Sequence, residues 1–299
     1  MKRILVTGAA GFIGRNCLDH FKDTTSFDIV KSRTHTIDNV QDLSFESHWN
    51  INFSNVDAVI HLASETSVRS SLPGREILRK NLDLSETVYR ACVINKVRLL
   101  INVSSSSLYG NVLAPQSEQD IPEPLSAYGM SKLAVEHALQ VNNFGNKRLT
   151  VVNLRLFNAL GKYQRHNMLP YQLLHNQRKG LTTELYGCRY RAWTPVNHIV
   201  KCLDTLIHSD KLQPGKTYTF NYGSPVTLSQ RDLIDIFEDN LCQAIHTRLV
   251  TDDRPTEMWT TLPNTERIEK ELKVSPPDLA DIRIAVNDVV NWYCASAHF

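Results

Sequence analysis

The sequence has 299 residues, of which 42% are hydrophobic and 21% are charged, with a formal net charge of +2. This composition describes one large or two modest globular domains. The basic residues are spread along the chain, unlike those of a general nucleic-acid-binding protein, and no run approaches the ~20 apolar residues of a membrane span. The six cysteines form no CxxC pair and the eleven histidines form no HExxH motif. We therefore expect a cytoplasmic protein without a metal site.

Short runs rich in Val, Ile and Leu alternate with helical patterns through the first half of the sequence. Strands are predicted at Arg3–Thr7, Phe27–Val30, Ala58–Leu62, Leu99–Ser104 and Leu149–Arg155. They lack the polar–apolar alternation of a sheet with one wet face. Helices are predicted at Phe12–Lys22, Arg75–Asn95 and Ala127–Asn142 from the spacing of their apolar residues. This order implies an α/β fold with a doubly wound, parallel sheet of the Rossmann type.

The alternation loosens after Phe157. Helices are predicted at Met168–Arg178, Val196–Ser209, Leu228–Leu241 and Leu279–Cys294, and a strand at Tyr218–Asn221. A capping sequence at Ser229–Asp232 marks the start of the third of these helices. We expect a cofactor-binding domain over residues 1–157 and a smaller, mixed α/β substrate domain over residues 158–299. About residues 194–222 are expected to return to the first sheet.

A glycine-rich segment, Gly8-Ala9-Ala10-Gly11-Phe12-Ile13-Gly14, connects the first predicted strand to the first predicted helix. In that context the first glycine permits a tight turn and the second lets the backbone approach a pyrophosphate. The third lets helix and strand pack closely, so that the phosphate meets the amides at the helix N-terminus. The segment predicts a dinucleotide site, with an ordinary strand-to-helix turn as the alternative.

Tyr128 and Lys132 are four residues apart in the predicted helix Ala127–Asn142, so their side chains share one face. An ammonium beside a phenol stabilises the phenolate, which would lower a tyrosine pKa that starts near ~10. Tyr128 would then be usable as an acid or base near neutral pH. Four serines, Ser104–Ser107, follow the preceding strand, and a hydroxyl there can bond the same substrate oxygen.

With these motifs the sequence resembles the extended short-chain dehydrogenases that modify nucleotide sugars, which include epimerases, dehydratases and reductases. The segments in the order of that family are TGAAGFIG, HLASETSV, KNLDLSETV, SSSSLYG, YGMSK, RLFNALG, YRAWTPVNHIV and DDRPTEMW. The resemblance covers nearly the whole chain. It implies an enzyme that binds NAD or NADP and a nucleotide-diphosphate sugar. It also implies a homodimer formed through the helices Arg75–Asn95 and Ala127–Asn142, with no membrane or nucleic-acid partner.

The resemblance also assigns residues. It implies a catalytic set of Ser105, Tyr128 and Lys132, in which Tyr128 is the acid/base and Lys132 binds the cofactor ribose. The further cofactor ligands it implies are Gly8, Gly11, Phe12, Ile13, Gly14, Asp42, Leu43, Leu62, Ala63, Ser64, Asn81 and Phe157. The substrate residues it implies are Thr66, Ser105, Asn158, Arg191 and Arg254. The two arginines would clamp the diphosphate, because the guanidinium fork matches phosphate oxygens.

Two serines restrict the chemistry. Dehydratases of the family carry Asp-Glu where this sequence has Ser106 and Ser107, and 3,5-epimerising branches carry a cysteine in place of Ser107. Both reactions therefore lack a proton-transfer group here. Reduction of a 4-keto sugar and 4-epimerisation remain, and the catalytic residues serve both. A non-catalytic cofactor sensor is a third alternative, which the intact catalytic set disfavours.

The end of the second predicted strand bears on that choice. NAD-preferring members place an acidic residue there, which accepts a hydrogen bond from the ribose 2′-hydroxyl. With the strand at Phe27–Val30, Asp28 falls inside it and Lys31 and Arg33 follow it. Basic groups suit the 2′-phosphate of NADP, the usual cellular reductant. The sequence therefore predicts an NADP-dependent 4-keto reductase, with an NAD-dependent 4-epimerase as the alternative.

Overall fold

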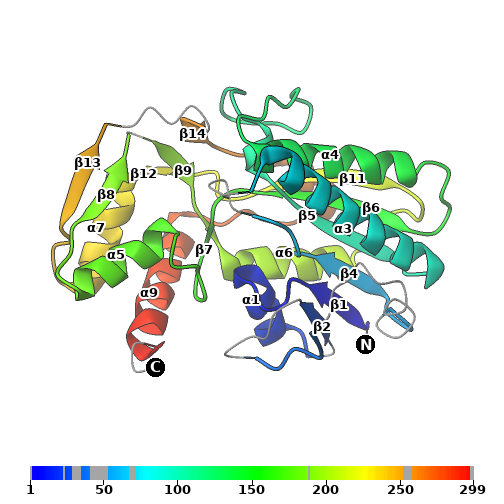
Figure 1. Cartoon of the computed structure of the whole chain (residues 1–299), viewed down its shortest axis with the longest axis horizontal. Coiled ribbons are helices and arrows are strands. Elements are labelled where there is room, and N and C mark those ends of the chain that lie inside the picture. Colours follow the sequence, from blue (N-terminus) through cyan, green and yellow to red (C-terminus); the bar gives the residue numbers. More distant parts are fainter. Residues whose placement is uncertain are drawn as a thin grey trace.

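The computed structural model describes residues 2–22, 24–28, 35–40, 53–66, 72–187, 189–251 and 258–296 (Figure 1). Its first half alternates strands and helices as the sequence predicted. The elements are β1 (Ile4–Thr7), α1 (Phe12–His20), β2 (Thr24–Asp28), β3 (Asn39–Val40), β4 (Ala58–His61), α3 (Gly74–Ile94), β5 (Leu99–Ser105), the short 3-10 turn η2 (Ser106–Leu108), α4 (Ala127–Asn142) and β6 (Thr150–Leu156).

Seven parallel strands form the central sheet, in the order β11-β6-β5-β4-β1-β2-β3, where β11 is Thr217–Tyr222. The chain starts at β1, winds outward through β2 and β3, and then continues on the other side of β1 from β4 to β6. This is the doubly wound order of a Rossmann-type sheet, so the predicted fold class is confirmed.

Helices cover both faces of this sheet (Figure 1). Ile4 and Val6 of β1 pack in one apolar core with α1 and with α6 (Val196–His208). Leu5, between them, packs in the opposite core with α3 and α4. Because both faces of the strand are buried, β1 is apolar without alternation. Within the part of the chain that the structure describes, no helix combines the length and the hydrophobicity that crossing a membrane requires.

The second half of the chain forms smaller sheets and a third core. Its remaining elements are β7 (Ala159–Leu160), α5 (Leu169–Arg178), β8 (Thr183–Tyr186), β9 (Tyr190–Ala192), β10 (Thr194–Pro195), β12 (Thr227–Ser229), α7 (Gln230–Leu241), β13 (Thr247–Val250), β14 (Thr260–Thr261), α8 (Glu266–Leu272) and α9 (Leu279–Ser296). β11 pairs with β6 at the edge of the central sheet, and α6 packs against that sheet's core. The division into two domains near residue 157 stays a prediction.

Strand β2 differs from its predicted position. It begins at Thr24 rather than at Phe27. The prediction missed its first three residues because Thr24, Thr25 and Ser26 lack the apolar side chains that indicated the other strands. In the parallel pairing with β1, Phe27 lies opposite Thr7. Asp28 is therefore level with Gly8, at the carboxyl edge of the sheet. The prediction that placed Asp28 in the strand interior is wrong.

Candidate active site

The glycine-rich loop leaves β1 at the carboxyl edge of the sheet. Gly8 has a φ of +70°, and a Cβ there would lie 2.7 Å from the backbone nitrogen of Ala63. A Cβ on Gly14 would lie 2.2 Å from the carbonyl oxygen of Gly8. The Gly11 amide closes the turn by donating to the Gly8 carbonyl at 3.0 Å. Larger residues would force the loop apart, so these glycines let it pack tightly at the start of α1, where helix amides favour an anion.

Asp28 is a site residue that the sequence analysis did not assign. Its carboxylate accepts a hydrogen bond from the Ala10 amide at 2.8 Å, so it borders the glycine-rich loop. Asp28 follows Gly8 by 20 positions, the approximate spacing of the acid that binds a ribose hydroxyl in dinucleotide-binding folds. The signal was present in the sequence, and the misplaced second strand concealed it.

Several predicted site residues lie outside the described residues. They are Lys31, Arg33, Asp42 and Leu43 of the cofactor set and Arg254 of the substrate set. Their roles stay predictions.

The segment after β4 lies beside the glycine-rich loop. The Leu62 amide donates to the Thr7 carbonyl at 3.1 Å, and the Ala63 amide donates to the Thr7 hydroxyl at 3.3 Å. Asn81 of α3 holds Glu65, two residues further on, because its side chain accepts from the Glu65 amide at 2.7 Å and donates to the Glu65 carbonyl at 3.1 Å. Asn81 thus orders this segment, and its predicted contact with a cofactor stays a prediction.

Four other predicted cofactor residues occupy the same edge. Ser64 lies in the segment after β4, where its hydroxyl donates to the Glu65 carbonyl at 3.4 Å. Phe12 is buried in the first turn of α1, followed by the half-buried Ile13. Phe157 is buried directly after β6, and its amide donates to the Tyr222 carbonyl at 3.2 Å.

The predicted catalytic residues lie at the carboxyl end of β5 and the start of α4. Ser105 is the last residue of β5. Tyr128 precedes Lys132 by one turn of α4, and Nζ of Lys132 lies 5.8 Å from the centre of the Tyr128 ring. A Cβ on Gly129 would lie 2.3 Å from the carbonyl oxygen of Ser107, so glycine lets α4 approach the serine turn. The structure therefore brings together the three residues that the sequence proposed.

Local sequence explains where α4 begins. The hydroxyl of Ser126 accepts a hydrogen bond from the Gly129 amide at 3.0 Å and caps the helix. The predicted bounds of this helix, Ala127–Asn142, are confirmed. Tyr128 consequently stands in the first turn, at the end of the helix that faces the serine turn.

Burial governs the protonation of Tyr128 and Lys132. It raises the pKa of Tyr128, an effect that a hydrogen bond with Ser105 opposes. Burial lowers the pKa of Lys132 to about 8, while its Nζ donates to the Val103 carbonyl at 3.0 Å. The expected lowering of the tyrosine pKa is therefore wrong for the chain by itself, because desolvation of the phenolate outweighs the nearby groups.

His61 at the end of β4 is a neutral, structural histidine. Its Nδ1 lies 2.7 Å from the Thr7 hydroxyl and its Nε2 lies 3.1 Å from the Ser85 hydroxyl. Burial, aided by the charge of Lys132, lowers the pKa of His61 to about 3. It is therefore the neutral imidazole, with one ring N–H, near neutral pH, and its two hydrogen bonds fix the edge of the sheet.

Arg165 is a second site residue that the sequence analysis missed. It precedes α5, and its guanidinium donates a hydrogen bond to the hydroxyl of Thr66, one of the predicted substrate residues. Its positive charge acts to lower the pKa of Tyr128, against the larger effect of burial. Arg165 therefore adds positive charge near Tyr128, from a loop that follows Tyr128 by more than 30 positions in the sequence.

A pocket of about 350 Å³ lies among β8, β9 and α5. Its walls carry amides, two arginines and two aromatic side chains: Asn158, Asn167, Leu169, Gln172, Asn176, Thr182, Thr183, Glu184, Tyr186, Arg189, Arg191, Trp193 and Gln230. Two of these, Asn158 and Arg191, are predicted substrate residues, and Arg189 joins them from the same strand region. Asn158 is oriented by its donation to the Thr261 hydroxyl at 2.7 Å.

Comparisons with known proteins agree with this geometry. The sequence model described as "NAD dependent epimerase/dehydratase family" matches residues 4–222. The chain is 27% identical over 271 residues to an uncharacterized UDP-glucose epimerase of Bacillus subtilis, covering 79% of this chain and 81% of the relative. It is 25% identical to UDP-glucuronate 4-epimerase 4 of Arabidopsis thaliana, covering 97% of this chain and 75% of that protein.

Solved structures give the same picture. MoeE5 in complex with UDP-glucose and NAD superimposes with a TM-score of 0.89 at 26% identity, over 99% of both chains. A UDP-N-acetylglucosamine 4-epimerase from Methanobrevibacter ruminantium has the same fold, with a TM-score of 0.88 at 23% identity over 99% of both chains.

Proposed function

The chain belongs to the NAD-dependent epimerase/dehydratase family, and from this premise we propose that it is an NAD-dependent 4-epimerase of a UDP-linked hexose. The sequence favoured an NADP-dependent reductase and kept this reaction as the alternative. The site and the relatives support the alternative better. Curated relatives are named 4-epimerases, and two complexes of the similar MoeE5 contain NAD.

The observation that carries the proposal is the position of Asp28 beside the glycine-rich loop. Its carboxylate, 2.8 Å from the Ala10 amide, would accept a hydrogen bond from the 2′-hydroxyl of an NAD ribose bound at this loop. A carboxylate there also repels the 2′-phosphate of NADP, since both are negative. The charge at this position therefore favours NAD, and with it a reaction in which the cofactor is retained.

The chain's own residues fit such a cofactor. Gly8, Gly11 and the start of α1 would hold the pyrophosphate, Asp28 the adenosine ribose, and Lys132 the nicotinamide ribose. When bound, NAD supplies a hydride acceptor that becomes the hydride donor of the return step.

Tyr128 performs the proton transfer. An epimerase needs one group that takes the proton of the C4 hydroxyl during oxidation and returns it during reduction. Tyr128 can do both, because Ser105 and the charge of Arg165 support its phenolate while burial favours the phenol. Ser105, which hydrogen-bonds Tyr128, orients the same C4 oxygen.

The pocket among β8, β9 and α5 supports a nucleoside diphosphate as the rest of the substrate. Its volume of about 350 Å³ suits a small ligand. Arg189 and Arg191 supply guanidinium groups that match phosphate oxygens, and the surrounding amides can bond a nucleobase.

We also propose a homodimer. Apolar side chains are exposed on α3 and α4, among them Ile94, Met130 and Val141, and burial of such groups against a second copy is favourable. Sedimentation equilibrium tests this, and a monomer at micromolar concentration would contradict it.

The function is tested by incubating the protein with UDP-glucose, UDP-glucuronic acid and UDP-N-acetylglucosamine and following the C4 configuration by NMR. We expect inversion of at least one sugar with catalytic NAD, because epimerisation consumes no reductant. The opposite result would be that the protein oxidises one NADPH for each 4-keto nucleotide sugar reduced and inverts none of the three UDP-sugars. That result would favour the reductase over the epimerase.

A further inference from the structure

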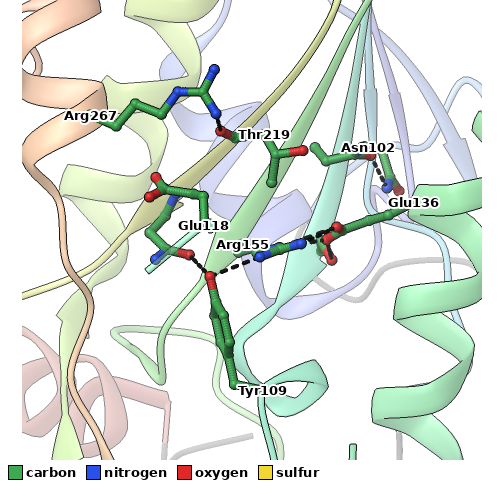
Figure 2. Close-up of polar contacts among 10 residues, drawn as sticks. Asn102, Tyr109, Glu118, Glu136, Arg155, Thr219 and Arg267 are labelled. Atoms are coloured by element: carbon green, nitrogen blue, oxygen red, sulfur yellow. Dashed lines mark hydrogen bonds and ion pairs between the residues drawn. The ribbon is translucent and has the colours of Figure 1, made fainter. Parts of the chain in front are cut away.

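A buried ion pair joins α4 to β6 (Figure 2). Nη2 of Arg155 lies 2.7 Å from Oε2 of Glu136, and Nε of Arg155 donates to both carboxylate oxygens at 3.1 Å. Oε1 of Glu136 also accepts from the Ser104 hydroxyl at 2.5 Å. Arg155 and Glu136 are only 6% and 3% exposed. The carboxylate of Glu136 is thus surrounded by donors from β5 and β6.

The guanidinium of Arg155 is fixed from its other end. Its Nη1 donates to the Tyr109 hydroxyl at 2.8 Å, and that hydroxyl donates to Oδ1 of Asn221 at 2.7 Å (Figure 2). Ser104, Arg155 and Asn221 are paired in register across β5, β6 and β11. Ser104 of β5 and Asn221 of β11 thus hold the two partners of the guanidinium, Glu136 and Tyr109. A satisfied buried network of this kind is rigid.

Glu136 is also a neighbour of the catalytic lysine. It follows Lys132 by four positions on α4, a spacing at which lysine and glutamate side chains usually meet. Here Nζ of Lys132 donates to the Val103 carbonyl at 3.0 Å instead. Within the described part of the chain, the recorded ion pair of Glu136 is the one with Arg155.

We propose that Arg155 is a positioning residue of the active site: by occupying the Glu136 carboxylate, it keeps Lys132 from pairing with Glu136 and leaves the ammonium at the Val103 carbonyl, beside Tyr128. The role of Lys132 in catalysis rests on the proposed function. The physical reason is that an uncompensated carboxylate in a buried site attracts a neighbouring ammonium strongly.

The other polar side chains near Lys132 are neutral, so Glu136 is its acidic neighbour among the described residues. α4 itself adds the Tyr128 phenol and β4 adds the neutral His61. α3 contributes Asn81, which is neutral and donates to Ser131 at 2.9 Å. Among the described residues, Glu136 is the acidic group whose charge raises the pKa of Lys132, against the lowering by burial.

The test follows the titration of Lys132 by NMR of the full chain labelled with ¹³C at the lysine ε-carbon, with Lys132→Met to assign the signal. In Arg155→Gln the pKa of Lys132 should rise by about one unit or more, the scale of a nearby opposite charge. In Glu136→Gln it should fall. The double variant, with neither charge, should lie between the two single variants and near the wild type.

Two controls separate this from general damage. Asn102→Ala removes a neighbouring side-chain hydrogen bond between β5 and β6, in which Asn102 donates to Asn153 at 2.8 Å. It changes no charge and should leave the pKa of Lys132 unchanged. Tyr109→Phe removes one hydrogen bond from Arg155 but keeps the ion pair with Glu136. It should also leave the pKa of Lys132 unchanged.

An unchanged titration in both Arg155→Gln and Glu136→Gln would overturn the proposal, as would an equal shift in Asn102→Ala. If Arg155→Gln does not fold, the downward shift in Glu136→Gln and its reversal in the double variant decide the question. The titration needs no substrate, so failure to epimerise any sugar contradicts the proposed function and not this inference.

Discussion

The ammonium of Lys132 donates to the backbone carbonyl of Val103 at 3.0 Å, and the lysine side chain is almost completely buried. One hydrogen bond does not replace the hydration of an ammonium, which is why burial lowers the pKa of Lys132 to about 8. A buried ammonium lowers the stability of the fold, and this cost can be measured.

Lys132→Met should stabilise the fold at neutral pH. Because the folded pKa is about 8 and the ordinary value is 10.5, the unfolded chain binds more protons between these values. The penalty is therefore full below pH 8 and disappears as the pH rises toward 10.5. It amounts to about 3 kcal/mol at most. Urea unfolding of both proteins at pH 7 and pH 9.5 measures the difference, which should shrink at the higher pH. A difference that is constant with pH would mean that Lys132 is not buried as an ammonium.

Asp28→Asn should weaken NAD binding and improve NADP binding. Asparagine retains an oxygen for the Ala10 amide, so the loop keeps its shape, but the negative charge is lost. A hydrogen bond to a charged group contributes roughly 1.5–3 kcal/mol, so the ratio of the two affinities should change at least tenfold. Calorimetric titration with both dinucleotides measures it. Tighter binding of NADP than of NAD by the wild type would contradict this role of Asp28 and would favour Lys31 and Arg33 as ligands of a 2′-phosphate.

Tyr128→Phe should reduce turnover by about 10²–10⁴, the range for loss of a positioned acid/base. The ring is retained, so the melting temperature and the affinity for NAD should change little. Turnover is measured by the rate of C4 inversion, and Ser126→Ala provides a control that weakens the cap of the same helix without touching the phenol. Near-normal turnover of the phenylalanine variant would remove Tyr128 from its role.

Local signals in the sequence were sufficient for the central fold and for α4, the helix that carries Tyr128 and Lys132. The predicted bounds of α4 are those of the structure, and the capping box predicted at Ser229 and Asp232 is present at α7. Strand β2 was misplaced because three of its residues are polar, and this error concealed Asp28.

Properties that depend on burial or on distant contacts were beyond the sequence. The spacing of Tyr128 and Lys132 gave their shared face but not the desolvation that sets their pKa values. Arg165 meets Thr66 across 99 positions, and no local pattern links the two. The same holds for Arg155, whose partner Glu136 lies on another element.

Arg191→Gln should weaken binding of UDP, because one guanidinium that lines the pocket is lost. The scale of a charge-assisted hydrogen bond, roughly 1.5–3 kcal/mol, corresponds to a loss of about ten- to hundredfold in affinity. Binding of uridine, which carries no phosphate, should be unchanged, so the comparison of the two ligands by calorimetry assigns the lost contact to the diphosphate. Lys270→Gln removes an exposed cation of α8 that pairs with Glu266 and should alter neither affinity. Equal losses for UDP and uridine would place Arg191 at the base, and no loss for either would remove it from the substrate site.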